Sequence, residues 1–292
     1  MNENLKYEKR IIAFIDILGF RELIKDSEKN PATLEKIYEV INYFKNWEKP
    51  ESWNLKTIEI EEDAQKKGLA KFDLSNKSTC TCFSDSIIVS IKISDGDINA
   101  ILSTLIANIS YIGSYIIQKG ILFRGAITIG NIIHQDNGII LGQGFIDAYN
   151  LESKLATFPR IVVSDKLISE LNYPLEAKRN RYPYHQYLTR DKDGCIGFNQ
   201  LKYFEVVQSW TEIKEDILKD ALDKTRKVII EGLDYSFELP SVHSKYQWLK
   251  NEYNNLIILT NNIKQPIKEL NESIAGQNIH FSYTDNYYYG KK

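Results

Sequence analysis

The order of strand and helix signals in this sequence predicts an α+β fold with a ferredoxin-like βαββαβ core. The apolar run Ile11 to Leu18 is typical of a buried strand, and two β-prone runs at 79–83 and 86–91 stand at hairpin spacing. A long helix with a continuous apolar stripe then precedes another strand at 121–129. We expect further strands beyond this core, followed by a C-terminal helical extension.

The first strand, R-I-I-A-F-I-D-I-L-G-F-R, is apolar from Ile11 to Leu18 except at Asp16. An ionised carboxylate buried without compensation costs several kcal/mol, so such an Asp usually meets a metal, a base or amide groups. The alternative is a structural one, in which Asp16 caps the turn at Gly19.

The hairpin supplies a second carboxylate. Only Ser84 and Asp85 separate its two strands, so Asp85 lies at the tip, where a purely structural turn Asp is also common. In a βαββαβ order the end of the first strand lies beside this tip, which brings Asp16 and Asp85 together. Two carboxylates repel unless a cation lies between them, and oxygen-only ligands suit Mg²⁺ or Mn²⁺ carrying a substrate phosphate.

Two helices are expected within the core. Asn30-Pro31 is a typical helix start, and the residues after it predict a helix to about Trp47 with the apolar face Leu34, Ile37, Tyr38, Ile41 and Phe44. The second helix carries the apolar stripe Ile98, Ile101, Leu102, Leu105, Ile106, Ile109, Ile112, Ile116 and Ile117. Between the first helix and the hairpin, residues 48–78 are charged and aperiodic, which indicates a surface insertion.

The strand at 121–129 contains one charged residue, Arg124. In the structural alternative Arg124 snorkels from a sheet edge, whereas beside the two aspartates its forked donors would suit a triphosphate. After a short strand at 139–141, Gly142-Gln143-Gly144 leads into a helix at about 145–157. This turn can offer amides to an anion or can be an ordinary tight turn.

The rest of the chain contains a short strand at 160–164, a proline- and aromatic-rich loop at 182–185 and a turn at 191–194. Two helices follow at about 213–229 and 248–263, and residues 276–292 form a polar, tyrosine-rich tail. His134 and His185 have no partner pattern around them, so we expect ordinary structural histidines.

The length, net charge and cysteine content of the chain exclude several classes of protein. With 292 residues, 43% apolar, the chain is long enough for one large domain or for a domain with an appendage. A net charge of -2 argues against general binding of nucleic acid or of anionic membranes. We expect no membrane span, because no apolar run approaches the required length, and no signal peptide. Cys80, Cys82 and Cys195 are odd in number and predict neither a disulfide framework nor a zinc site, which favours a reducing cytoplasm.

Four segments together resemble the catalytic domain of class III nucleotidyl cyclases, most closely the pyrimidine cyclases of bacterial Pycsar antiphage defence. They are F-I-D-I-L-G-F (14–20), F-S-D-S (83–86), F-R-G-A-I-T-I-G (123–130) and G-x-G-F-I-D-A-Y-N-L-E (142–152). The resemblance covers about residues 8–165, a cyclase or palm-type core, and leaves 166–292 as the extension.

The resemblance implies roles for individual residues. Asp16 and Asp85 would hold two Mn²⁺ or Mg²⁺ ions with the Ile17 carbonyl nearby, and Arg124 would bind phosphate. The other residues implied in substrate binding are Phe20, Thr81, Gly142 and Gly144.

Two departures from the family pattern bear on the substrate and on the chemistry. Thr81 and Ile139 stand where purine cyclases have a Lys and an Asp, which favours UTP or CTP, with UTP slightly preferred on family prevalence. Ile146 and Asn150 stand where the family has its transition-state Asn and Arg, and Asn150 or Lys154 could substitute.

The implied reaction converts UTP or CTP into the 3′,5′-cyclic monophosphate and pyrophosphate, as a second messenger for an effector that the sequence does not identify. The implied active unit is a homodimer with shared active sites. Two alternatives remain open: a catalytically silent nucleotide-binding signalling domain, and a purine cyclase.

Overall fold

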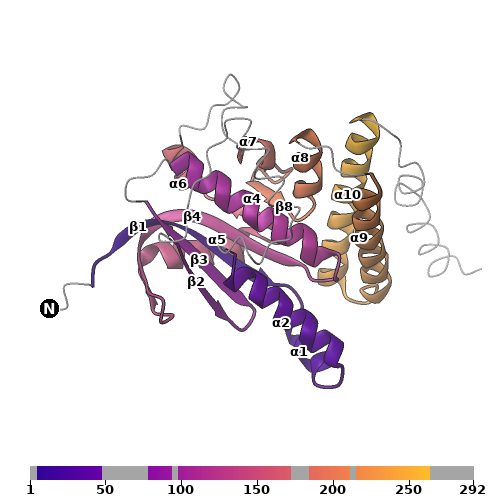
Figure 1. Ribbon diagram of the computed structural model, residues 1–292, viewed down its shortest axis with the longest axis horizontal. Coiled ribbons are helices and arrows are strands. Elements are labelled where there is room, and N and C mark those ends of the chain that lie inside the picture. Colours follow the sequence, from indigo (N-terminus) through magenta and orange to yellow (C-terminus); the bar gives the residue numbers. More distant parts are fainter. Residues whose placement is uncertain (1–4, 48–77, 94–97, 172–183, 211–214, 264–292) are drawn as a thin grey trace, which may run out of the picture. The chain divides into compact units, whose positions relative to one another are not determined.

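The computed structural model describes residues 5–47, 78–93, 98–171, 184–210 and 215–263 (Figure 1). The expected insertion at 48–78, apart from Ser78, and the tyrosine-rich tail lie outside the described residues. The chain divides into two compact units, one formed by Met1–Gly113 with Leu122–Gln200 and the other by Ser114–Ile121 with Leu201–Lys292. The division into a catalytic domain at 8–165 and an extension at 166–292 stays a prediction.

The first unit is an α+β domain built on an eight-stranded sheet of order β2-β3-β1-β4-β6-β8-β7, with β5 paired to β4 outside this path. The strands are β1 (Glu8–Ile17), β2 (Ser78–Phe83), β3 (Ser86–Lys92), β4 (Phe123–His134), β5 (Ile140–Leu141), β6 (Arg160–Val163), β7 (Thr189–Arg190) and β8 (Ile196–Asn199). Its helices are α1 (Phe20–Ser27), α2 (Pro31–Lys45), most of α4 (Ile98–Ile117), α5 (Gln143–Leu155), α6 (Asp165–Glu170) and α7 (Tyr184–Tyr187).

The sheet contains the predicted ferredoxin-like core. β1 lies between β3 and β4 and is antiparallel to both, and β2 and β3 form the expected hairpin. Strand order β2-β3-β1-β4, with helices between β1 and β2 and between β3 and β4, is the βαββαβ arrangement. The sheet continues past β4 through β6, which is parallel to β4, and then through β8 and β7. The fold-class prediction is therefore confirmed.

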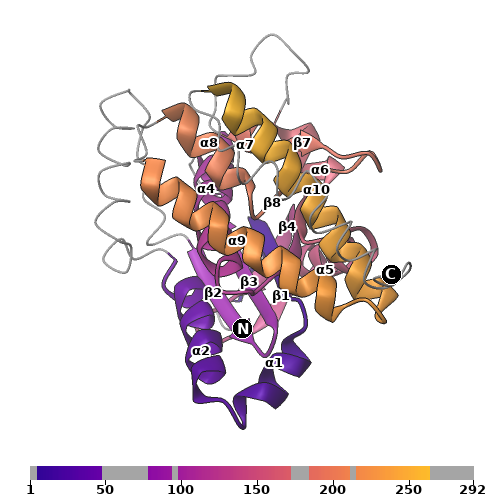
Figure 2. The ribbon, with the colours of Figure 1, turned by 90° about the vertical axis from the view of Figure 1, so that its right-hand side faces the viewer.

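Helices α2 and α4 cover one face of this sheet (Figures 1 and 2). The ring of Phe44 on α2 meets that of Phe123 on β4 edge to face, with centroids 5.9 Å apart. Gly113 of α4 packs against the same Phe123 ring, where a Cβ would come within 3.1 Å. The rings and the glycine fix both helices on β4, next to the central strand.

The predicted start of α2 is confirmed, but its apolar face is partly wrong. The side chain of Asn30 accepts a hydrogen bond from the Ala32 amide at 3.2 Å, as an N-cap does. Leu34 and Tyr38 are exposed, and the buried residues are instead Thr33, Ile37, Val40 and Phe44. The buried face of α2 is rotated relative to the predicted one, because the helix packs on the sheet through Thr33, Ile37, Val40 and Phe44. The spacing of apolar residues alone did not predict this face.

Helix α5 covers the opposite face, over β1 and β4. Its Ala148 and Phe145 pack with Ile12, Phe14 and other side chains of a buried cluster. The backbones of α5 and β4 approach closely, since a Cβ on Gly130 would lie 2.7 Å from Cα of Gly144. Glycine at both positions thus lets the helix lie directly on the strand.

The second unit is helical in its described part, with α8 (Lys202–Trp210), α9 (Glu215–Tyr235) and α10 (Pro240–Ile263). The two predicted long helices correspond to α9 and α10, which pack together (Figure 2). The hydroxyl of Tyr253 on α10 donates to the Leu222 carbonyl on α9 at 3.2 Å. Gly232 leaves room for the ring of Tyr246, which a Cβ would strike.

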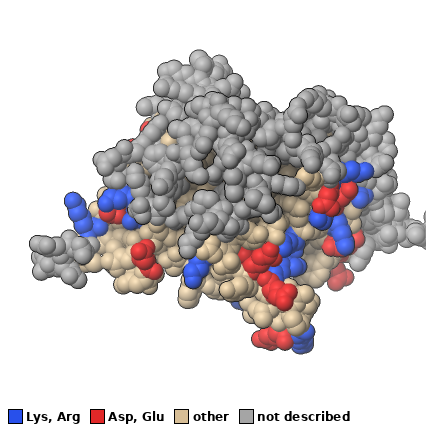
Figure 3. All heavy atoms as spheres, viewed as in Figure 1, with Lys and Arg blue, Asp and Glu red and all other residues tan. Residues whose placement is uncertain are grey.

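Two further expectations need correction. Tyr184 and His185, expected in a loop at 182–185, belong to the short helix α7 (Tyr184–Tyr187). Among the described residues, α4 is long and apolar enough to cross a membrane, contrary to the expectation that no segment approaches that length. Its residues are mostly buried within the protein, as in the core helix of a soluble protein. Acidic and basic side chains are interspersed over the described surface on the face drawn in Figure 3.

Candidate active site

The candidate site lies where β1 ends beside the β2–β3 hairpin. Asp16 is the residue of β1 that faces Ser86 on β3 and Arg124 on β4 in the strand register. The amide of Ile17 donates to the Asp85 carbonyl at 2.9 Å, which fixes the hairpin tip against the end of β1. Ser84 at this tip has a positive φ of 56°. The structure therefore brings the two predicted aspartates to the same end of the sheet.

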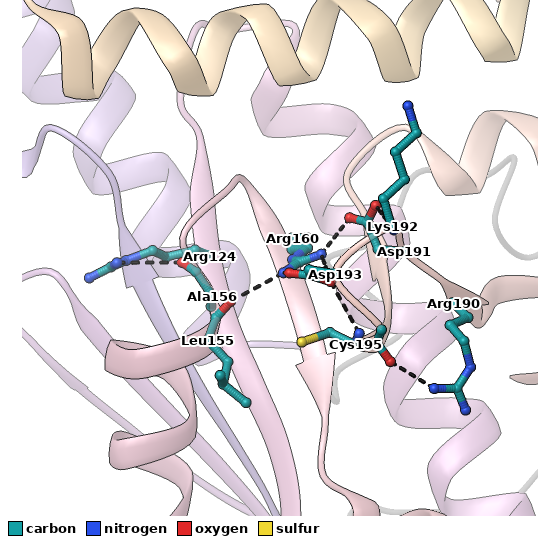
Figure 4. Close-up of polar contacts among 10 residues, drawn as sticks. Arg124, Leu155, Ala156, Arg160, Arg190, Asp191, Lys192, Asp193 and Cys195 are labelled. Carbon is teal, nitrogen blue, oxygen red and sulfur yellow. Dashed lines mark hydrogen bonds and ion pairs between the residues drawn. The ribbon is translucent and has the colours of Figure 1, made fainter.

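Arg124 lies at the centre of the site, on a strand that is flanked on both sides. Because β4 lies between β1 and β6, the alternative of an arginine snorkelling from a sheet edge is wrong. Its Nε donates to Oδ2 of Asp16 at 3.2 Å, and its Nη1 lies 3.4 Å from the Ala156 carbonyl. Figure 4 shows Arg124 from β4 and Arg160 from β6 reaching the last carbonyls of α5, with Arg160 donating to Leu155 at 3.2 Å. Two guanidinium groups thus cap the C-terminal end of α5.

Glu152 is a site residue that the sequence analysis did not single out. It lies on α5 with its side chain 3% exposed, and its Oε1 is 2.7 Å from Nε of Arg124. That contact is an ion pair only, because the Nε hydrogen points to Asp16 and no donor points at Oε1. A signal was readable, since Gly144, Ala148 and Glu152 follow at four-residue spacing and form the buried stripe of the helix.

Burial and mutual repulsion perturb the acids of this site. Burial raises the pKa of Glu152 to about 7, with Arg124 lowering it and the charges of Asp16 and Asp85 raising it further. The pKa of Asp16 is also raised, chiefly by burial and less by Asp85, against the lowering effect of Arg124. Asp16 and Glu152 therefore share the Arg124 guanidinium, and the charge of Asp85 acts on both acids.

This charge balance fits a divalent cation. Full ionisation of Asp16, Asp85 and Glu152 would exceed the charge of Arg124 by two, and a bound cation would offset that excess. Within the described residues, no three His, Cys, Asp or Glu side chains group as a metal site. Two aspartates would therefore need backbone and substrate oxygens to complete the coordination shell, which suits Mg²⁺ or Mn²⁺.

The remaining predicted residues lie around this centre. Thr81 is on β2 and, being paired with Ile88 of β3 in the register, shares the α5 face of the sheet. Phe20 is half-buried as the first residue of α1, directly after Gly19 with φ 71°. Ile17 is buried at the end of β1.

The α5 residues named by the resemblance do not join the centre within one chain. Asn150 is half-buried and Lys154 exposed, and neither side chain pairs with another residue in the described part of the chain. Gly142 has φ 134°, and a Cβ there would lie 2.5 Å from the Asn131 carbonyl. Gly142 and Gly144 thus have packing roles, and their contact with substrate stays a prediction.

No protein-family model and no curated protein matches this chain. Three solved structures align with 66% of it at low TM-scores. The catalytic core of a rhodopsin-guanylyl cyclase with converted specificity, in complex with ATPalphaS, is 14% identical, with 94% of that chain covered and a TM-score of 0.33. The monomeric guanylyl cyclase domain of the RhoGC fusion protein from the aquatic fungus Blastocladiella emersonii is 14% identical, with 94% covered and a TM-score of 0.35. An adenylate/guanylate cyclase/hydrolase from Silicibacter pomeroyi is 17% identical, with 95% covered and a TM-score of 0.32.

Proposed function

We propose that this chain is a nucleotide cyclase that converts a pyrimidine nucleoside triphosphate, UTP or CTP, into its 3′,5′-cyclic monophosphate and pyrophosphate. The observation that carries the proposal is the meeting of Asp16, Asp85 and Arg124 at one end of a ferredoxin-like sheet. The two carboxylates can hold metal ions, and the neighbouring guanidinium can bind phosphate. This combination suits an enzyme that catalyses substitution at a phosphorus atom.

In the proposed reaction the ribose 3′-hydroxyl releases its proton to solvent and its oxygen attacks the α-phosphorus, the bond between that phosphorus and the bridging oxygen to the β-phosphate breaks, and pyrophosphate leaves with that oxygen. Mn²⁺ or Mg²⁺ held by Asp16 and Asp85 would lower the pKa of the attacking hydroxyl and neutralise the triphosphate. Arg124 binds the triphosphate with its forked donors. Glu152 is a positioning residue, because its ion pair holds the guanidinium between β1 and α5.

Support for a pyrimidine base comes from the residues on the base side. Thr81 on β2 and the exposed Ile139, next to β5, offer no charged pair that could read a purine edge. The finer points of the proposal are a slight preference for UTP, a cytoplasmic location and synthesis of a second messenger in antiphage defence. They rest on the sequence resemblance.

The proposed active unit is a homodimer with shared active sites. Large apolar side chains lie exposed around the site on the α5 side of the sheet, and Phe83 at the hairpin tip is 77% exposed. The others are Ile139, Leu141, Ile146 and Tyr149. A second copy of the chain would bury these side chains and could bring its own Asn150 and Lys154 to the site.

The decisive experiment incubates the purified chain with each of the four nucleoside triphosphates and Mn²⁺ and identifies the products by mass. We expect cyclic UMP or cyclic CMP and pyrophosphate, and no product after chelation of the metal. A clean yield of cyclic AMP or cyclic GMP would overturn the pyrimidine assignment.

One observation favours a second candidate, a catalytically silent nucleotide-binding signalling domain. Arg124 is already paired with Asp16 and Glu152, so the cluster is partly compensated without metal. Binding of a triphosphate with no product of any base in Mn²⁺ would support this candidate and reject the cyclase.

A further inference from the structure

A chain of buried polar side chains leads across the α5 face of the sheet to Thr81. Nη1 of Arg10 donates to Oγ of Ser90 at 3.0 Å, and Ser90 Oγ lies 2.8 Å from Nδ1 of His134. Nε2 of His134 then lies 2.9 Å from Oγ1 of Thr81. Arg10, Ser90 and His134 are buried, whereas Thr81 is only half-buried and ends the chain.

The direction of each hydrogen bond follows from the arginine, which can only donate. Ser90 is fully buried, and within the described residues its hydroxyl meets only Arg10 and Nδ1 of His134. Since the Ser90 oxygen accepts from Arg10, its hydrogen is directed to Nδ1, which must be the unprotonated nitrogen. The single ring proton of a neutral His134 is then on Nε2 and is donated to Thr81.

His134 is held neutral by its surroundings. Burial and the nearby Arg10 charge lower its pKa to about 4, although Asp136 acts in the opposite direction. The Thr81 oxygen accepts a hydrogen bond from Nε2, so the hydrogen of the Thr81 hydroxyl is not used in that bond. Within the described chain Thr81 has no further hydrogen-bond partner, so this hydrogen is available to a ligand.

The position of Thr81 suits the base of a nucleotide. It is on the same sheet face as Asp16 and Arg124, and it lies two residues before the end of β2, which corresponds to about 7 Å at the rise of a strand. The turn before β5 borders it, because a Cβ on Gly138 would lie 3.9 Å from Cγ2 of Thr81. Phosphate groups at Asp16 and Asp85 would leave the base near Thr81.

We propose that Arg10, Ser90 and His134 fix the Thr81 hydroxyl as a hydrogen-bond donor that selects a keto base, so that uracil is preferred over cytosine through its O4 carbonyl. This inference rests on the proposed function and deepens it. A base with an amino group at that point offers the hydroxyl hydrogen no acceptor, and an unmade buried hydrogen bond lowers affinity. Thr81 is the specificity-determining residue, and the other three are positioning residues.

The first test compares kcat/KM for UTP and CTP in variants of the full chain. Thr81→Val, which removes only the hydroxyl, should lower the UTP to CTP ratio about tenfold, whereas Thr81→Ser should keep it. Ser90→Ala should also lower the ratio, through KM more than kcat. The matched control is Thr79→Val, since Thr79 also accepts from Arg10 at 3.2 Å but does not touch His134.

The second test needs no turnover. Nitrogen-15 NMR of the His134 ring in the nucleotide-free chain should show the proton on Nε2, and Ser90→Ala should release this tautomer. A proton on Nδ1 in the wild type, or an unchanged ratio in Thr81→Val, would overturn the inference. Failure of the proposed function looks different, since the wild type would then form no cyclic product from any nucleotide.

Discussion

At the scale of single residues, the site is a cluster of acids that is incompletely neutralised. Asp16 and Glu152 both pair with the Arg124 guanidinium, the nearby Asp85 charge acts on both acids, and burial raises the pKa of Asp16 and Glu152. Such shifts are typical of functional sites, where charge is held ready for a substrate or a metal ion. Two of the acids were predictable from strand ends and turns, whereas Glu152 required knowing which side of α5 faces the sheet.

Neutralising the aspartates should separate activity from folding. We expect Asp16→Asn and Asp85→Asn each to reduce cyclic product formation in Mn²⁺ by a hundredfold or more, of the order seen when a group that stabilises transition-state charge is lost. Removing a buried charge should leave the metal-free fold intact or slightly stabilised. Asp165→Asn, on the exposed first turn of α6, is the control and should retain activity. Near wild-type turnover in either site variant would reject the metal assignment.

Arg124 should contribute to binding of the triphosphate whatever its base. Loss of a charge-assisted, forked contact in Arg124→Ala should weaken binding by about 1.5 to 3 kcal/mol. Titration calorimetry with non-hydrolysable UTP and CTP analogues in Mn²⁺ measures this, with Arg190→Ala on edge strand β7 as the control. Unchanged affinity in a folded Arg124→Ala protein would mean that the ion pairs of Arg124 are structural.

Glu152 should make the stability of the metal-free protein depend on pH. Its pKa is about 7 in the folded protein and 4.5 ordinarily, so the folded state retains a proton that the unfolded chain releases. The free energy of unfolding should therefore fall as pH rises from about 4.5 to 7. Glu152→Gln removes this loss and should be about 1 to 3 kcal/mol more stable than wild type at pH 8, with little difference at pH 4.

Urea denaturation in the presence of a chelator, at both pH values, tests this expectation. Glu22→Gln on the exposed surface of α1 is the matched control. A stability difference between Glu152→Gln and wild type that is the same at pH 4 and pH 8 would contradict the assignment.

At the scale of elements, the strands, turns and helices that have their own sequence pattern were predicted. Side-chain contacts that depend on the register between strands were not. The buried run of β1, the two-residue turn of the hairpin and the stripe of α4 each carry their own signal, so Asp16, Asp85 and Arg124 could be brought together. The chain from Arg10 to Thr81 could not, because it depends on the register of β1, β2, β3 and β4. For this reason the sequence analysis treated His134 as an ordinary structural histidine.

The close approach of α5 to β4 yields a prediction at this scale. In Gly144→Ala a Cβ would lie 2.8 Å from Cδ1 of Ile12, 2.9 Å from Cγ2 of Ile132 and 3.1 Å from the backbone of Gly130, so the isoleucine side chains and α5 must shift. We expect a loss of about 1 to 3 kcal/mol of stability, and lower activity because Glu152 moves with the helix. Ser153→Ala, on the exposed side of α5, should change neither; equal thermal denaturation midpoints for the two variants would contradict this packing role.

At the scale of the whole molecule, a single chain leaves its candidate site open. Asp16 and Arg124 lie on the sheet face that α5 covers over β1, β4 and β6, and Phe83 at the hairpin tip is exposed on that face. The side chains of Asn150 and Lys154 pair with no other residue in the described structure. These features support the proposed homodimer, in which each chain contributes residues to the active site of the other.

Mixing two inactive variants tests this arrangement. One variant carries Asp16→Asn and the other Asn150→Ala with Lys154→Ala, so each homodimer has a lesion in both of its sites. In a mixed dimer both lesions fall in one site and the other site is intact. Random pairing of equal amounts makes half of the dimers mixed, so co-refolding should restore about a quarter of wild-type activity. Separately refolded and then briefly mixed variants serve as the control, and no recovery, together with a monomeric mass for the active wild type, would reject the shared site.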